Sequence, residues 1–173
     1  MLVQKSNNKK KVIYLKKQIL MLTVSLLVIF SATSSSFAAS KRCDNDPATS
    51  GCTDSYSGTF NLITHGASVS NDFRIQYSRD WNTGSYYRWN VNTGVSYSSR
   101  TGMDYEVHLN TVYATATVDY YVDGIYVSTI NQDTAPGGWN SIGSGTNYGT
   151  VYMKLDATDA WNDTVADAVR ISW

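Results

Sequence analysis

Five aromatic side chains in polar or turn-rich surroundings are the residues of this chain best suited to contact a ligand. They are Trp81, Tyr86, Tyr121, Tyr126 and Trp161. Aromatic rings stack on the apolar faces of sugar rings, while nearby Asn, Asp and Arg side chains bond the hydroxyl groups. These residues therefore predict a surface that contacts carbohydrate. Packing within the fold is the alternative for each of them.

Two of these aromatics are placed together by a predicted β-hairpin that turns at Asp123-Gly124. Asp-Gly is preferred in two-residue turns with positive φ at both positions. The register pairs Tyr121 with Tyr126 on a polar face. The opposite face, expected in the core, pairs Val122 with Ile125, Tyr120 with Val127, and Val118 with Thr129. Cross-strand aromatic pairs stabilise a sheet by about 0.2–1 kcal/mol, so the tyrosines are either a stabilising contact or a flat platform for a sugar.

The loop from 156 to 163 gathers the side chains that could bind a metal ion. Its carboxylates are Asp156, Asp159 and Asp163. Calcium takes six to eight oxygen ligands, and a loop of this composition supplies several of them. The spacing differs from that of an EF-hand, and acidic turns are common without metal. Calcium is thus a possible cofactor, and we predict no other.

Catalytic patterns are missing from the sequence. It has no nucleophile elbow and no metal-binding His pair. Glu106 and His108 share one face of a predicted strand, which the alternation of an exposed strand explains. We expect no enzymatic activity.

The elements that carry these residues are β-strands. Apolar residues recur at every second position in three stretches, which are 73–77, 105–109 and 151–155. This period of two predicts strands with one buried and one wet face. Turn clusters rich in Gly, Asn and Asp separate them. We predict an all-β fold, a jelly-roll-like antiparallel β-sandwich over residues 56–173, as a single domain.

The N-terminus has the order of a secretory signal. Residues 1–17 carry six lysines and no acid, an apolar run covers 19–30, and small residues end at Ser36-Phe37-Ala38-Ala39. The apolar run is shorter than the roughly 20 residues that span a bilayer, and an uncleaved anchor is the alternative. We predict a signal peptide over 1–38 and a secreted protein, extracellular or associated with the cell wall.

Loss of the signal changes the net charge. The residues after it hold eight basic side chains against fourteen acidic ones, a net charge of −6. Binding to nucleic acid needs clustered Lys and Arg, and anionic membranes select the same charge. We predict neither partner for the processed chain.

The two cysteines, Cys43 and Cys52, lie soon after the predicted cleavage site. In an exported chain, a disulfide is the default for such a pair. We expect the bridge to close the N-terminal segment 39–55 and to add little to the core.

Short motifs along residues 104–173 carry a family resemblance. They are Asp104-Tyr105-Glu106-Val107, Asn131-Gln132, Gly138-Trp139 through Ile142-Gly143, and Ala166-Asp167-Ala168-Val169-Arg170. Together they resemble the golvesin C-terminal-like domain, also described as the xanthan-lyase carbohydrate-binding-like domain. In residues 56–103 only Tyr86-Tyr87-Arg88 contributes. The resemblance implies a β-sandwich module that binds rather than reacts and accompanies secreted bacterial enzymes.

Two residues of these motifs have expected structural roles. Trp139 is expected to anchor the core. Asp167 lies on the apolar face of the last predicted strand, 165–173, where a carboxylate needs partners. We expect it to accept backbone N–H groups, for example from the Gly137-Gly138 turn, with a calcium role as the alternative.

The sequence thus predicts a secreted, non-catalytic module that binds carbohydrate or cell-wall polysaccharide through exposed aromatics. A structural or protein-interaction component of the cell envelope or extracellular matrix is the competing class.

Overall fold

The computed structural model describes residues 39–45, 50–80, 82, 84–157 and 161–173. These residues form an antiparallel β-sandwich, as the sequence predicts, with three short 3-10 turns and no α-helix among them. The turns are η1 (Val69–Asn71), η2 (Ser78–Asp80) and η3 (Tyr97–Ser99). Within the described part of the chain, no helix has the length and apolar character needed to cross a membrane.

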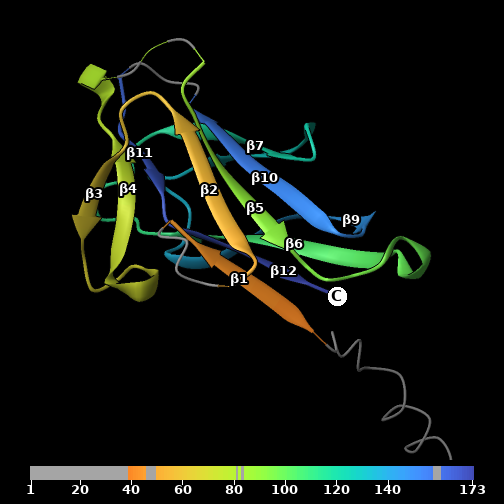
Figure 1. Cartoon of the computed structure of the whole chain (residues 1–173). Coiled ribbons are helices and arrows are strands. Elements are labelled where there is room, and N and C mark those ends of the chain that lie inside the picture. The colour runs from red at the N-terminus through yellow and green to blue at the C-terminus, as the bar shows by residue number, and fades with distance from the viewer. Residues whose placement is uncertain (1–38, 46–49, 81, 83, 158–160) are drawn as a thin grey trace, which may run out of the picture. The chain divides into compact units, whose positions relative to one another are not determined.

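Three sheets make up the fold (Figure 1). Sheet A has the order β1 (Ser40–Asp44), β12 (Ala168–Ser172), β6 (Thr101–Leu109) and β9 (Gly138–Asn147). Sheet B has the order β2 (Cys52–Ser57), β5 (Tyr86–Asn92), β10 (Thr150–Ala157), β7 (Thr117–Val122) and β8 (Ile125–Asn131). Sheet C has the order β11 (Thr164–Ala166), β4 (Asp72–Gln76) and β3 (Asn61–Thr64). Figure 1 shows β2, β5 and β10 side by side, and β3 with β4 at one flank.

The main core lies between sheets A and B, and its residues follow the predicted period of two. Tyr105 and Val107 of β6 point inward, as do Met153 and Leu155 of β10, and all four are buried. A second, smaller cluster includes Phe73 of β4 and belongs to sheet C. Their neighbours in sequence point outward, which leaves the outer face of each main sheet to polar and aromatic side chains.

The predicted disulfide between Cys43 and Cys52 is present, with Cα atoms 5.5 Å apart. It joins β1 of sheet A to β2 of sheet B. The expectation that this segment adds little to the core is wrong, because the cysteines are 0% and 5% exposed and lie within the main cluster. The bridge therefore ties the two layers of the sandwich together.

The β7–β8 hairpin turns at Asp123 and Gly124 with φ angles of 50° and 81°, as Asp-Gly predicts. Tyr121 faces Tyr126 in the predicted register. Beyond this pair the register shifts at a β-bulge, so the pairings predicted there are wrong: Tyr120 faces Ser128, Asp119 faces Thr129 and Val118 faces Ile130. The expected inward position of Ile125 is also wrong, since this side chain is 71% exposed at the end of the hairpin.

The last predicted strand is divided in two at Asp167. β11 pairs with β4 in sheet C, whereas β12 pairs with β1 and β6 in sheet A. A strand that changes sheets in this way must interrupt its backbone hydrogen bonding to neighbouring strands, and Asp167 is the residue between β11 and β12. One carboxylate thus sits where sheets A and C meet.

Candidate functional site

The outer face of sheet B brings together three of the five predicted ligand-binding aromatics. Tyr86 comes from β5, Tyr121 from β7 and Tyr126 from β8. Tyr86 and Tyr121 are outward residues of alternating strands, since their neighbours Tyr87, Tyr120 and Val122 are buried, and Tyr126 faces Tyr121 across the hairpin. The rings of Tyr121 and Tyr126 lie 5.9 Å apart in a T-shaped arrangement, and Tyr126 is 53% exposed.

A row of side chains crosses all five strands of this face. The register aligns Ser55, Arg88, Lys154, Tyr121 and Tyr126. Residues directly opposite on adjacent strands contact each other on one face. The row therefore places two cations beside two aromatic rings on a solvent-facing sheet.

The cations of this row are held over tyrosine rings. Lys154 Nζ lies 4.6 Å from the ring centroid of Tyr121 and 5.6 Å from that of Tyr86. Arg88 lies 5.7 Å from the ring centroid of Tyr152. Lys154 also pairs with Asp156 at 2.8 Å, which limits the charge available to a ligand. Such cation–π contacts hold the rings and cations in one arrangement before any ligand arrives.

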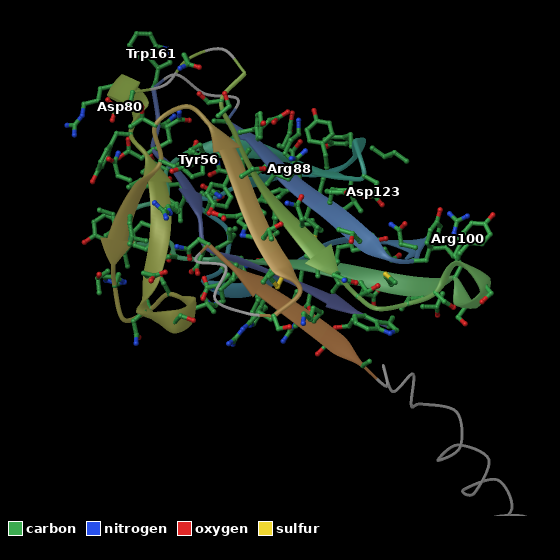
Figure 2. The ribbon with its side chains drawn as sticks, in the orientation of Figure 1. Tyr56, Asp80, Arg88, Arg100, Asp123 and Trp161 are labelled. Carbon is green, nitrogen blue, oxygen red and sulfur yellow. A yellow bond between two sulfur atoms is a disulfide. The ribbon has the colours of Figure 1, made fainter. Side chains whose placement is uncertain are left out.

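A groove of about 840 Å³ continues from this row toward the hairpin turns. Its lining consists of Arg88, Arg100, Asp123, Gly124, Asn147, Tyr148, Gly149, Thr150, Tyr152 and Lys154. Figure 2 shows Arg88 in the middle of the sheet, with Asp123 and Arg100 toward one end. Arg100 lies 5.9 Å from the ring centroid of Tyr148, which itself contacts the exposed ring of Tyr97. The surface of aromatic and cationic side chains therefore extends beyond the three predicted tyrosines to Arg100, Tyr148 and Tyr97.

Of the remaining two predicted aromatics, the structure describes only Trp161, which is not part of this face. Trp161 is 88% exposed and lies at the opposite end of the molecule from Arg100 (Figure 2). Trp81 lies outside the described residues. The predicted set therefore does not form one site, and sheet B collects its three tyrosines.

Sequence reasoning missed Arg88, Arg100, Tyr148 and Tyr152. A signal for two of them was present, because the alternation that buries Val151 and Met153 turns Tyr152 outward, and the one that buries Tyr87 and Trp89 turns Arg88 outward. Tyr148 and Arg100 stand in turns far apart in sequence, and only the pairing of β6 with β9 brings them close. That pairing had no local signature.

Two of the three candidate calcium ligands, Asp156 and Asp163, have protein partners. Asp156 pairs with Lys154, and Asp163 accepts the backbone N–H of Ser78 at 2.8 Å. Asp159 lies outside the described residues. Among the described residues, no group of three or more His, Cys, Asp or Glu side chains is arranged to hold a metal ion.

Trp139 is not a core residue, contrary to expectation. It faces His108 across the β6–β9 ladder, on the outer face of sheet A, and is half-buried. The guanidinium of Arg170 lies 4.5 Å from its ring centroid. A bulge near Tyr105 and Glu106 changes the phase of β9, so that Ile142 supplies the inward side chain of this strand.

Asp167 is buried, as expected, at 1% exposure. Its Oδ1 accepts the backbone N–H of Val69 at 3.1 Å, so the donor is in η1 and the expectation of Gly137-Gly138 is wrong. Its Oδ2 lies 2.8 Å from Nδ1 of His108. Burial raises the pKa of the Asp167 carboxyl, and the hydrogen bond with His108 opposes that rise. Asp167 thus orients His108, whose ring meets Trp139 edge-on at 5.2 Å.

No family profile and no curated protein matches the chain. Solved structures do match. Xanthan lyase from Paenibacillus has a TM-score of 0.54 and 23% identity over 81% of this chain, which spans only 13% of that enzyme. A family 35 carbohydrate-binding module from Clostridium thermocellum has a TM-score of 0.52 and 16% identity, covering 78% of this chain and 98% of the module. Another, from an environmental isolate, has a TM-score of 0.54 and 14% identity, covering 77% and 93%.

The chain has a carbohydrate-binding-module-like fold. Identities this low establish the architecture alone, and the finer resemblance to golvesin-type domains stays a prediction. This chain matches the two family 35 modules named here over almost their whole length. It matches only a small part of xanthan lyase.

Proposed function

We propose that this protein is a secreted, non-catalytic module that binds polysaccharide through the outer face of sheet B. The observation that carries the proposal is the cross-strand row that sets Arg88 and Lys154 beside Tyr121 and Tyr126. Flat aromatic faces supply stacking area, and fixed cations bond hydroxyl or carboxylate groups. The fold shared with family 35 modules supports the same class of ligand.

The charge of the groove favours acidic polysaccharides. Arg88, Arg100 and Lys154 line it, against a single lining carboxylate, that of Asp123. Because Asp156 pairs with Lys154, the two arginines supply the excess charge. The buried disulfide fits export, because such bridges persist in oxidising compartments. We place the module outside the cell, at the cell wall or on free polysaccharide.

The test is retention on insoluble polysaccharides, acidic and neutral, and on purified cell wall. Tyr121→Ala/Tyr126→Ala removes both rings, and we expect retention to fall at least tenfold, as loss of two stacked rings implies. Tyr121→Phe/Tyr126→Phe is the matched control, since it keeps the rings and should keep retention. Failure of the native protein to bind any glycan would contradict the proposal and favour contact with a protein of the envelope or matrix.

A further inference from the structure

The outer face of sheet A carries a second groove, on the other layer of the sandwich. Its volume is about 540 Å³. It is lined by Ser40, Asp104, Glu106, Ser141, Gly143, Ser144, Arg170 and Ser172. All four strands of the sheet contribute, and none of these residues belongs to the tyrosine face of sheet B.

The groove is built from two rows that the register lays across the sheet. One row aligns Ser40, Ser172, Asp104 and Ser144. The neighbouring row aligns Arg42, Arg170, Glu106 and Ser141. Small side chains in the first row beside long ones in the second leave a trough along the serine row.

One wall of this trough is the ion pair of Arg170 and Glu106, which Trp139 supports from behind. Arg170 donates from Nε to Glu106 Oε2 at 2.6 Å and from Nη2 to Oε1 at 2.8 Å. Such a fork holds both groups in one plane. The guanidinium carbon lies 4.5 Å from the ring centroid of Trp139, and His108, held by the buried Asp167, meets that ring edge-on. The wall is therefore preorganised.

The serine row, in contrast, has unused hydrogen-bonding capacity. No hydrogen bond to another described residue engages the Asp104 carboxylate or the hydroxyls of Ser40, Ser141, Ser144 and Ser172. Carboxylates accept from hydroxyl groups, and serine both donates and accepts. A row of this kind matches a ligand that presents several hydroxyl groups at once.

The charge of the groove selects among such ligands. Among the lining residues the single cation, Arg170, is neutralised by Glu106, which leaves Asp104 as the excess charge of the lining. The exposed Arg42 at the end of the neighbouring row stands outside the lining. An acidic sugar would meet an unpaired carboxylate here, whereas an uncharged one would not. This preference is the reverse of the one at the cationic groove on sheet B.

We propose that the groove on sheet A is a second saccharide site, which takes uncharged, hydroxyl-rich sugar units. Asp104 and the serines bond the hydroxyls, and the Arg170–Glu106 pair, backed by Trp139, supports the ring. The protein then holds two glycan segments of different charge on its two outer faces. This site does not depend on the function proposed for sheet B.

The experiment is a nuclear magnetic resonance titration of residues 39–173, the whole chain after the predicted signal. The ligands are uncharged β-1,4-linked glucose, mannose and xylose oligosaccharides at millimolar concentrations. We expect changes at the Trp139 indole N–H and at the amides of Asp104 and Ser144. Ser144→Tyr fills the trough from an exposed position and should abolish them. Ser144→Ala leaves it open and should change affinity only a few-fold. Asp104→Ala should weaken binding about tenfold.

The Tyr121→Ala/Tyr126→Ala variant separates the two proposals, because it should keep the response of sheet A intact. The second site is overturned if no oligosaccharide of the set perturbs the amides of sheet A. It is also overturned if the perturbations persist unchanged in Ser144→Tyr, or if oligogalacturonate binds this groove more tightly than the uncharged sugars.

Discussion

At the scale of single residues, buried carboxyl groups give the clearest link between structure and measurable behaviour. Asp44 is 5% exposed, and its Oδ1 accepts the N–H of Asn45 at 2.8 Å. Burial raises the pKa of this carboxyl above its usual 3.8, and the nearby carboxylates of Asp167 and Asp72 add to the effect. The folded protein therefore binds this proton more tightly than the unfolded chain.

The sign of the resulting pH dependence follows from linkage. The stabilising contribution of Asp44 is fully present below pH 3.8 and is lost as the pH rises through the raised pKa of the folded state. Asp44→Asn stays neutral throughout, so it should gain stability relative to the native protein as the pH rises. Urea unfolding at a series of pH values measures this difference. Asp133→Asn, at an exposed position, is the control, and a pH-independent difference for Asp44→Asn would refute the argument.

At the scale of elements, the hairpin between β7 and β8 shows what a local signal can specify. Gly124 has φ of +81°, and a Cβ at this position would meet nothing within 4 Å. The whole cost of Gly124→Ala is therefore backbone strain, about 1 kcal/mol. Gly102→Ala is a matched control, because its Cβ also meets nothing and its φ is not in the left-handed region. Equal melting temperatures for the two variants would contradict this assignment.

The disulfide acts between elements rather than within one. Cys43 and Cys52 are nine residues apart in sequence but sit in different sheets. A bridge that closes so short a loop stabilises the folded state by about 2–4 kcal/mol, because it restricts the conformations of the unfolded chain. We expect Cys43→Ser/Cys52→Ser to lose that amount, plus the cost of two hydroxyls in the core, in equilibrium urea unfolding. A loss below about 1 kcal/mol would show that the bridge is peripheral after all.

Prediction from the sequence succeeded where the cause is local. The period of two identified the strands, and Asp-Gly identified the turn and the Tyr121–Tyr126 pair. It failed at the bulge of the β7–β8 hairpin, which shifted the pairing from Tyr120 onward, and at Trp139, which pairs with His108 on the outer face of sheet A. No pattern along the chain marks a bulge of this kind, because the pairing partner lies far away in sequence.

Assembly of the candidate surfaces is also non-local. Arg88, Lys154 and Tyr121 meet because β10 lies between β5 and β7, and the serine row on sheet A needs strands from both ends of the chain. The sequence shows which side chains point outward. It does not show which of them become neighbours.

At the scale of the whole molecule, the two outer faces of the sandwich differ in local charge. The residues after the predicted signal carry a net charge of −6. The overall charge repels an acidic polysaccharide, so its capture depends on the local field of Arg88, Arg100 and Lys154. The first and last described residues pair, since Ala39 and Trp173 exchange backbone hydrogen bonds of 3.0 and 2.9 Å. Both described ends therefore lie at one edge of sheet A.

Salt separates the contributions of the two faces. Raising the ionic strength from about 0.1 M to about 1 M shortens the Debye length from about 10 Å to about 3 Å. This screens the long-range repulsion and also weakens the exposed contacts of the three cations with carboxylates. Because close contacts of these cations carry the binding, we expect affinity for an acidic polysaccharide to fall several-fold over this range, and affinity for an uncharged oligosaccharide to stay constant.

Isothermal titration with Arg88→Gln/Arg100→Gln should then show a weaker affinity for the acidic polysaccharide and a smaller dependence of that affinity on salt. An affinity for the acidic chain that rises with salt would mean that repulsion by the net charge dominates, and the cationic groove would lose its assigned role.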